Sequence, residues 1–396
     1  ASDVYKRQVI DHLKFKASYG LVGNDQIGGN RRFIYNETIK NGGSYSFGMQ
    51  NTSYTGLILG DWPNPNVGWE TVRKLNAGVD LSLFGKVKIQ VDYFNEKRSG
   101  IFLQASSIPA IAGLATKPWI NIGKMNNEGF DASLEYHQRV GEVDITARGN
   151  FTYAHNTIVD NDQPDWEYLY MNTIGQSNWQ QFGLVSAGLF RSQEEIDAWP
   201  KQEFGEVKPG DIKYVDINGD GVVNNYDRKA IGYPDVPEIV YGFGASVRWK
   251  GFDLSVFFQG VGNVNFFTNT EQTQPFSASK SRNANVYSDL WGNYWTPENP
   301  NAKYPRLTIG ANENNNRLST FWMVNGNYLR LKNAEIGYTL PKRILSKAHI
   351  DKLRIYLSGV NLVTFSKFKL WDPDLQTGAA NYPNNRVYNL GVTLVF

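Results

Sequence analysis

Apolar and polar residues alternate with a period of two along much of the chain. The first clear example is Leu13, Phe15, Ala17, Tyr19 and Leu21, which alternate with lysine, serine and glycine. Successive side chains of a β-strand point to opposite faces, so this pattern predicts strands with one apolar face. About ten such strands are predicted, at residues 13–21, 75–83, 87–93, 130–136, 143–153, 239–249, 252–258, 334–340, 353–357 and 388–396.

The connections between these strands alternate between short and long. Short connections lie at 84–86, 140–141, 250–251 and about 341–351, and long ones at about 22–72, 98–128, 157–238, 261–327 and 363–385. Antiparallel barrels in outer membranes have tight turns at one end and long loops at the other. The pattern therefore favours an all-β, antiparallel transmembrane β-barrel with long extracellular loops. A secreted β-sandwich, whose strands also alternate, is the alternative. Short helical turns are predicted at 192–198 and 342–348.

Composition and charge exclude several other classes of protein. The 396 residues include 40 Lys and Arg against 38 Asp and Glu, with the two signs interspersed. Nucleic acid is therefore not an expected partner, because no basic stretch is present to bind phosphates. There is no cysteine, and the four histidines are scattered. No set of acid, base, nucleophile or metal ligands converges, so we do not expect an enzyme.

Several short motifs, taken in order, resemble those of one known family. They include Asn-Pro-Asn-Val-Gly-Trp-Glu-Thr at 64–71, Asn-Ile-Gly-Lys-Met-Asn-Asn-Glu-Gly-Phe at 121–130 and Trp-Thr-Pro-Glu-Asn-Pro at 295–300. Asn-Tyr-Leu-Arg-Leu-Lys-Asn at 327–333 and Ser-Gly-Val-Asn-Leu at 358–362 follow. Their order and spacing over residues 9–396 resemble the SusC/RagA family of TonB-linked (TonB-dependent) outer-membrane proteins.

The resemblance implies a domain organisation. Members have a 22-stranded barrel, so about ten strands would be the C-terminal portion of such a barrel. The plug domain and its TonB box would lie upstream and are absent from residues 9–396. Residues 1–8, which read like translated sequencing adapter, are expected to be a fragment artefact.

The resemblance also implies a function and partners. The family imports oligosaccharides, glycan fragments or peptides together with a SusD-like outer-membrane lipoprotein, driven by TonB–ExbB–ExbD through the plug. The barrel would lie among lipid and lipopolysaccharide in the outer membrane of a Gram-negative, Bacteroidetes-like bacterium. Phe396 would be the terminal signal read by the barrel assembly machinery. The alternative is a surface-exposed, calcium-stabilised β-rich binding or adhesion protein.

Residues 216–227 fit an EF-hand-like or dockerin-like calcium loop. Asp216, Asn218 and Asp220 occupy positions 1, 3 and 5, glycine occupies position 6, and the carbonyl of Val222 position 7, followed by Asn224 and Asp227 at positions 9 and 12. Asp227 replaces the usual glutamate and has a shorter reach. The sequence therefore predicts a structural Ca²⁺ site, with an Asx-rich turn that binds no metal as the alternative.

Aromatic residues gather in two of the long loops. One group contains Trp166, Tyr168, Tyr170 and Trp179, and the other contains Trp291, Tyr294 and Trp295. Exposed rings can stack on sugars or anchor a protein partner, whereas packing of each loop on itself is the favoured alternative. The Asn-rich runs at 312–316 and 381–385 predict turns and solvated surface.

Polar residues on two neighbouring predicted strands share the inward parity. They are Asp131, Ser133, Glu135 and His137 on one strand and Arg148, Asn150 and Thr152 on the other. They predict a polar lumen wall that lines the substrate path or contacts the plug, with the wall and plug contact favoured. Asp131 and Glu135 are not a glycosidase pair, because residues four apart on a strand lie about 13 Å apart.

Overall fold

The computed structural model describes residues 9–25, 33–114, 116–270, 273, 286–310, 312–346, 349–378 and 381–396. Its main element is one ten-stranded antiparallel sheet in which strands adjacent in the sheet follow each other in the chain. The prediction of about ten strands is therefore confirmed. The strands are β1 (Ile10–Asn24), β4 (Glu70–Leu83), β5 (Val87–Gln104), β6 (Trp119–Val140), β7 (Val143–Asp160), β14 (Ile239–Trp249), β15 (Phe252–Gly262), β18 (Tyr328–Thr339), β19 (Lys352–Ser366) and β20 (Val387–Val395).

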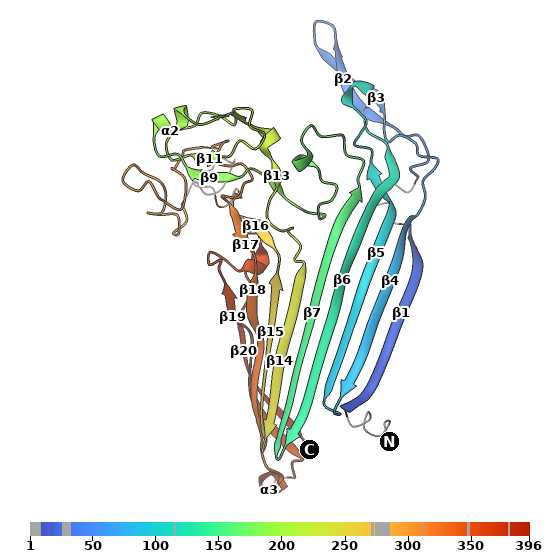
Figure 1. Cartoon of the computed structure of the whole chain (residues 1–396), viewed down its shortest axis with the longest axis vertical. Coiled ribbons are helices and arrows are strands. Elements are labelled where there is room, and N and C mark those ends of the chain that lie inside the picture. Colours follow the sequence, from blue (N-terminus) through green and yellow to red (C-terminus); the bar gives the residue numbers. More distant parts are fainter. Residues whose placement is uncertain are drawn as a thin grey trace.

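The sheet curves like part of a barrel wall, with its short and long connections at opposite ends (Figure 1). Strands β1 and β20 form the two edges, and each pairs with a single neighbour within the described residues. The predicted alternation of turns and loops is thus confirmed. Among the described residues, the helices and strands outside this sheet lie at the loop end, except one short helix in the connection between β18 and β19.

Smaller elements fill the long connections. The β2–β3 hairpin (Ile39–Phe47 and Thr52–Leu59) projects beyond the loop end of the sheet. Helix α2 (Gln193–Asp197) begins after the cap Ser192, and α3 (Lys342–Leu345) lies at the turn end. Both predicted helical turns are therefore confirmed, although residues 347–348 of the second lie outside the described residues. The remaining elements are η1 (Ala110–Ala112), η2 (Leu169–Met171), β8 (Phe182–Gly183), β9 (Ser186–Leu189), β10 (Lys201–Gln202), β11 (Ile212–Tyr214), β12 (Val222–Val223), η3 (Asn225–Asp227), β13 (Lys229–Ala230), β16 (Asn265–Phe267), β17 (Met323–Asn325) and η5 (Pro373–Leu375).

Among the described residues, no helix has the length and apolar character needed to cross a membrane.

Strands β5 to β7 are longer than the alternation predicted. The expected connection 98–128 shrinks, because β5 continues to Gln104 and β6 already begins at Trp119. β6 has 22 residues, about twice the 9–11 that a tilted strand needs to cross a bilayer. Beyond the lipid both faces of a strand meet water, so the alternation fades while the backbone pairing continues.

One face of the sheet is apolar and open to its surroundings. In the middle of the sheet, Leu134, Phe243, Leu254 and Ile336 are 45–52% exposed. They belong to a wider set with the same parity, which includes Leu13, Phe15, Val91, Phe130, Ile355, Leu357, Leu390 and Val392. Soluble monomers rarely expose so large a continuous apolar surface. This face fits the lipid-facing band of a transmembrane barrel.

Two glycines on neighbouring strands should respond very differently to a methyl group. A Cβ added to Gly129 would lie 1.9 Å from the backbone carbonyl oxygen of Tyr153 and 2.7 Å from the Phe94 ring. Gly129→Ala should therefore cost about 1–3 kcal/mol through overpacking. It should lower the fraction of the complete protein that migrates as a folded, heat-modifiable barrel on unheated gels.

Gly149→Ala is the matched control for this prediction. A Cβ added to Gly149 meets its nearest neighbour, the carbonyl oxygen of Gly242, at 3.6 Å, an ordinary contact. This variant should retain the wild-type folded fraction. Equal folded fractions for both variants would contradict the packing of β6 against β7.

Candidate functional site: the polar wall and the loop unit

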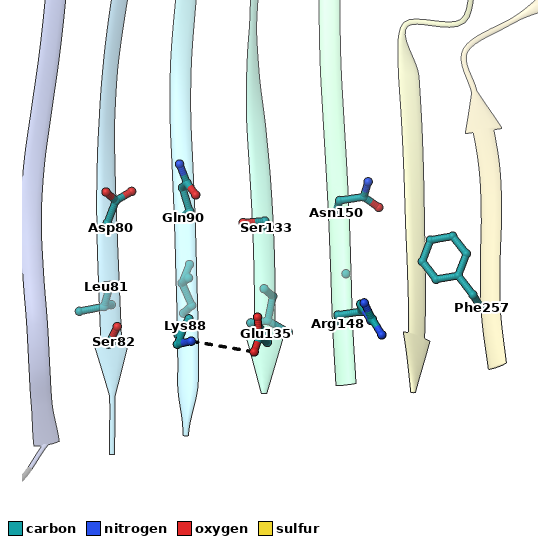
Figure 2. A pocket seen from close by; sticks show the side chains of 13 residues that line it. Asp80, Leu81, Ser82, Lys88, Gln90, Ser133, Glu135, Arg148, Asn150 and Phe257 are labelled. Carbon is teal, nitrogen blue, oxygen red and sulfur yellow. Dashed lines mark ion pairs between the residues drawn. The ribbon is translucent and has the colours of Figure 1, made fainter. Parts of the chain in front are cut away.

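The face opposite the apolar band carries rows of polar side chains that run across the strands. One row passes from Lys88 through Glu135 and Arg148 to Gly244 and Phe257. The next row contains Gln90, Ser133, Asn150, Gly242 and Gln259. Figure 2 shows the labelled polar side chains on one face of β4 to β7, where they line a shallow hollow of about 590 Å³. Such a wall suits water and polar solutes, as expected of a barrel lumen.

The structure pairs the residues predicted for this wall across β6 and β7. Asp131 lies opposite Thr152, Ser133 opposite Asn150, and Glu135 opposite Arg148. The Thr152 hydroxyl donates to Asp131 at 2.7 Å. His137 lies opposite Thr146 and 3.2 Å from Asp144, at the turn end. These contacts join wall residues to one another.

Two ion pairs cross three strands, and each passes over a glycine. Lys16 of β1 reaches Asp92 of β5 at 3.0 Å, across Gly78 of β4. A Cβ on Gly78 would lie 2.1 Å from the Asp92 carboxylate, so only glycine leaves this path open. Sequence reasoning missed these bridges, because alternation gives the face of a residue but not its neighbours two strands away.

The same arrangement recurs near the other edge of the sheet. Arg354 of β19 pairs with Asp253 of β15 across Gly337 of β18, with its Nε 3.0 Å from the carboxylate, and it also pairs with Glu335. A Cβ on Gly337 would lie 2.5 Å from the Arg354 guanidinium. The two bridges fasten three strands each on the polar side of the sheet.

Two long connections fold together above the sheet. Residues of 161–238 and 263–327 share one hydrophobic core, which we call the loop unit. Its fully buried members include Leu184, Ile212, Tyr214, Val223 and Leu290. Backbone hydrogen bonds between Leu184 and residues 318 and 320, at 2.9 and 3.0 Å, join the two connections. The two loops therefore form one packed body.

A buried aspartate organises the loop unit. Asp211 has no exposed surface, and its carboxylate accepts hydrogen bonds from Arg306 at 3.1 Å, Asn312 at 3.0 Å and Asn315 at 2.8 Å. The backbone N–H of Lys208 donates to it at 2.8 Å. A buried carboxylate needs such a full set of partners, because burying an uncompensated charge is costly.

The expectation of a solvated surface was wrong for part of the 312–316 run. Asn314 and Asn315 are 1% and 4% exposed. The Asn314 amide donates to the carbonyl of Ile212 at 2.9 Å, and Asn315 accepts from the N–H of Ile212 at 2.9 Å. These amides satisfy the backbone groups of the buried strand β11, which have no water to bond with. Asparagine therefore serves here as a buried hydrogen-bond partner and not as a surface residue.

The predicted calcium loop forms a tight turn that ends in η3. Asp216 accepts from the N–H groups of Gly219 at 2.7 Å and Gly221 at 2.8 Å. Asp227 is fully buried and accepts from Ile217 and Asn224, each at 2.7 Å. Asp220 accepts from Val222 at 2.8 Å. Within the described residues, no three acidic or histidine side chains are grouped to hold a metal ion, although the oxygen donors suit a hard cation.

The aromatic residues predicted as loop contacts occupy three kinds of position. Trp166, Trp179 and Trp291 are 41%, 64% and 69% exposed. Tyr294 packs against the core of the loop unit. Trp295 covers Gly210 so closely that a Cβ there would lie 2.4 Å from its ring. The three exposed tryptophans are therefore free to meet a ligand or partner, whereas Tyr294 and Trp295 hold the loop unit together.

Sequence reasoning gave no role to Arg330 except as part of the 327–333 motif. Its side chain is 2% exposed and lies on the face opposite Leu329 and Leu331. It pairs with Asp372 and, at 3.2 Å, with Asp374, which fastens the connection between β19 and β20 over the polar face. The available signal was a cation at an inward position between two outward leucines, Leu329 and Leu331.

The remaining predicted positions lie at the ends of the chain. Phe396 directly follows β20 and is 80% exposed. Residues 1–8 lie outside the described residues.

Comparisons with known proteins agree with this geometry. The chain is 28% identical over 413 residues to TonB-dependent receptor P3 of Formosa agariphila, covering 97% of the chain and 39% of that protein. It is 24% identical over 401 residues to TonB-dependent receptor SusC of Bacteroides thetaiotaomicron, covering 98% of the chain and 38% of that protein. The chain thus spans about two fifths of the length of these curated relatives.

Solved structures share the fold. The RagAB peptide transporter superposes with a TM-score of 0.71 at 23% identity, over 98% of this chain and 41% of that one. The RagAB peptide importer in its "open-open" state gives 0.72 at 21% identity. The family model described as "TonB dependent receptor-like, beta-barrel" matches residues 4–228. With ten antiparallel strands, an apolar outer face and a polar inner face, this chain belongs to the TonB-dependent receptor β-barrel family.

Proposed function

We propose that this chain is the C-terminal barrel portion of a SusC-like importer that takes up oligosaccharides, glycan fragments or peptides across the outer membrane. The observation that carries the proposal is the sheet itself, which has one exposed apolar face and one polar face. Its edge strands β1 and β20 each pair with only one neighbour within the described residues. Further strands would have to pair with these edges, since lipid offers no partner for free backbone groups.

Two regions would contact the proposed partners: the loop end and the polar wall. A SusD-like lipoprotein would sit at the loop end, where the loop unit offers a packed surface with exposed Trp166, Trp179 and Trp291. Their large rings suit contacts with a protein or a sugar. A plug domain contributed by the rest of the protein would lie against the polar wall and couple it to TonB–ExbB–ExbD.

The adhesion alternative explains the loops but not the sheet. An adhesion protein in water would gain nothing from apolar side chains such as Phe243 and Leu254, about half exposed in the middle of its sheet. In a membrane the same side chains avoid water. In the importer, Phe396 would serve as the signal for barrel assembly. Lipid and lipopolysaccharide would surround the apolar face of the sheet.

Import is tested with the complete gene in its own organism. A deletion strain should lose growth on one glycan or peptide source that supports the parent, and a plasmid copy should restore it. Affinity purification of the restored protein should recover an outer-membrane lipoprotein in near-equal amount. Unchanged growth on every glycan and peptide source tried, with no lipoprotein recovered, would contradict the proposal.

We also propose a structural calcium ion in the 216–227 turn. The support is the order of oxygen donors and their remaining lone pairs, since each carboxylate oxygen that accepts one N–H can still accept a second partner. Asp216 and Asp220, which lie in the same tight turn, also repel each other unless a cation lies between them. The ion would order the connection 161–238 rather than act as a sensor.

Limited proteolysis tests the calcium proposal. Chelator, or the double change Asp216→Ala with Asp220→Ala, should speed cleavage within 161–238 severalfold while leaving the barrel folded. Asp165→Ala with Glu167→Ala removes two exposed acids from the same connection and should change nothing. Identical cleavage with calcium and with chelator would reject the proposal in favour of the metal-free turn.

A further inference from the structure

A second hollow, of about 520 Å³, lies at the loop end of the sheet, away from the polar wall. It is formed where β17 and the loop unit meet the chain just after β19. Its apolar lining is formed by Phe321, Trp322, Met323, Val324, Phe368 and Leu370. Few neutral hydrogen-bonding side chains line it, chiefly Thr268 and Asn325.

The same hollow has an excess of positive charge. Lys303, Lys367, Lys369 and Asp289 line it. Asp289 is committed to Lys303 at 2.7 Å and to the Tyr304 hydroxyl at 2.6 Å, and these hydrogen bonds hold the pKa of Asp289 below its usual value. Lys367 and Lys369 make no ion pair or hydrogen bond with the described part of the chain. One acid therefore faces three lysines.

The backbone that carries Lys367 and Lys369 is held in place by buried neighbours. Phe368, between them, is 8% exposed and packs edge-on against Phe266 at 5.0 Å and Trp371 at 4.6 Å between ring centroids. Arg330 holds the following turn through Asp372 and Asp374. Lys367 and Lys369 are both exposed on this anchored segment. Their positions are therefore set by buried neighbours, unlike those of lysines on a free loop.

We infer that this hollow is a binding site for an acidic peptide, which would place an apolar side chain on the Phe321–Met323–Leu370 lining and a carboxylate on Lys367 and Lys369. Apolar walls suit peptide side chains, whereas a sugar would need more neutral hydrogen-bond partners for its hydroxyls than Thr268 and Asn325 provide. The ammonium groups of Lys367 and Lys369 attract a carboxylate and can donate charge-assisted hydrogen bonds to it. The inference rests on the proposed import function and narrows its substrate class.

The test is equilibrium binding to the purified complete transporter. The probes are the peptide Leu-Glu-Leu-Glu, its amide counterpart Leu-Gln-Leu-Gln and the acidic sugar trigalacturonate. Leu-Glu-Leu-Glu should bind about tenfold tighter than Leu-Gln-Leu-Gln. Lys367→Gln with Lys369→Gln should abolish that preference, and raising the salt concentration should reduce it.

Lys201→Gln is the matched control, because Lys201 is an exposed lysine of the loop unit outside this hollow. It should keep the full preference for the acidic peptide. Equal binding of the acidic and amide peptides, or tighter binding of trigalacturonate that depends on the two lysines, would overturn the peptide assignment. Loss of growth in the deletion strain would still uphold import in that case, so the two failures are distinguishable.

Discussion

Backbone groups in lipid must find partners within the protein, and the rest of this structure depends on that constraint. Ten strands meet it by pairing in chain order, so every strand except the two edges has a neighbour on both sides. Alternation then gives each strand one face for lipid and one for the lumen. The exposed apolar band, the polar rows and the crossing ion pairs at Gly78 and Gly337 all follow from this division.

The loops obey the opposite constraint, because they lie in water and must bury their own core. Two connections of more than 60 residues share one core around Ile212 and Tyr214 instead of forming separate flexible segments. Buried polar groups stabilise it only because each has partners, as at Asp211. A loop body of this kind holds the exposed tryptophans, and one side of the hollow beside Lys367 and Lys369, in fixed positions.

The sequence predicted the strands correctly wherever one face of a strand meets lipid and the other meets the lumen, because apolar and polar residues then alternate. It placed all ten strands, both helical turns and the pairing of Asp131 to Glu135 with Arg148 to Thr152. It underestimated the lengths of β5 and β6 at the loop end, where both faces of a strand meet water. It could not place Arg330, Asp211 or Asn314, because most of their side-chain partners lie 34 to 112 residues away in the chain. Contacts of that kind follow from tertiary packing, which no local pattern encodes.

The two-sided sheet is the central claim, and spin labels along β7 test it directly. The chain has no cysteine, so single cysteines can be placed in turn at residues 147–152 of the complete protein in bilayers. Collision with dissolved oxygen, which concentrates in lipid, should peak at 147, 149 and 151 and fall at 148, 150 and 152. Uniform oxygen accessibility, or maxima at the even positions, would contradict the membrane orientation of the sheet.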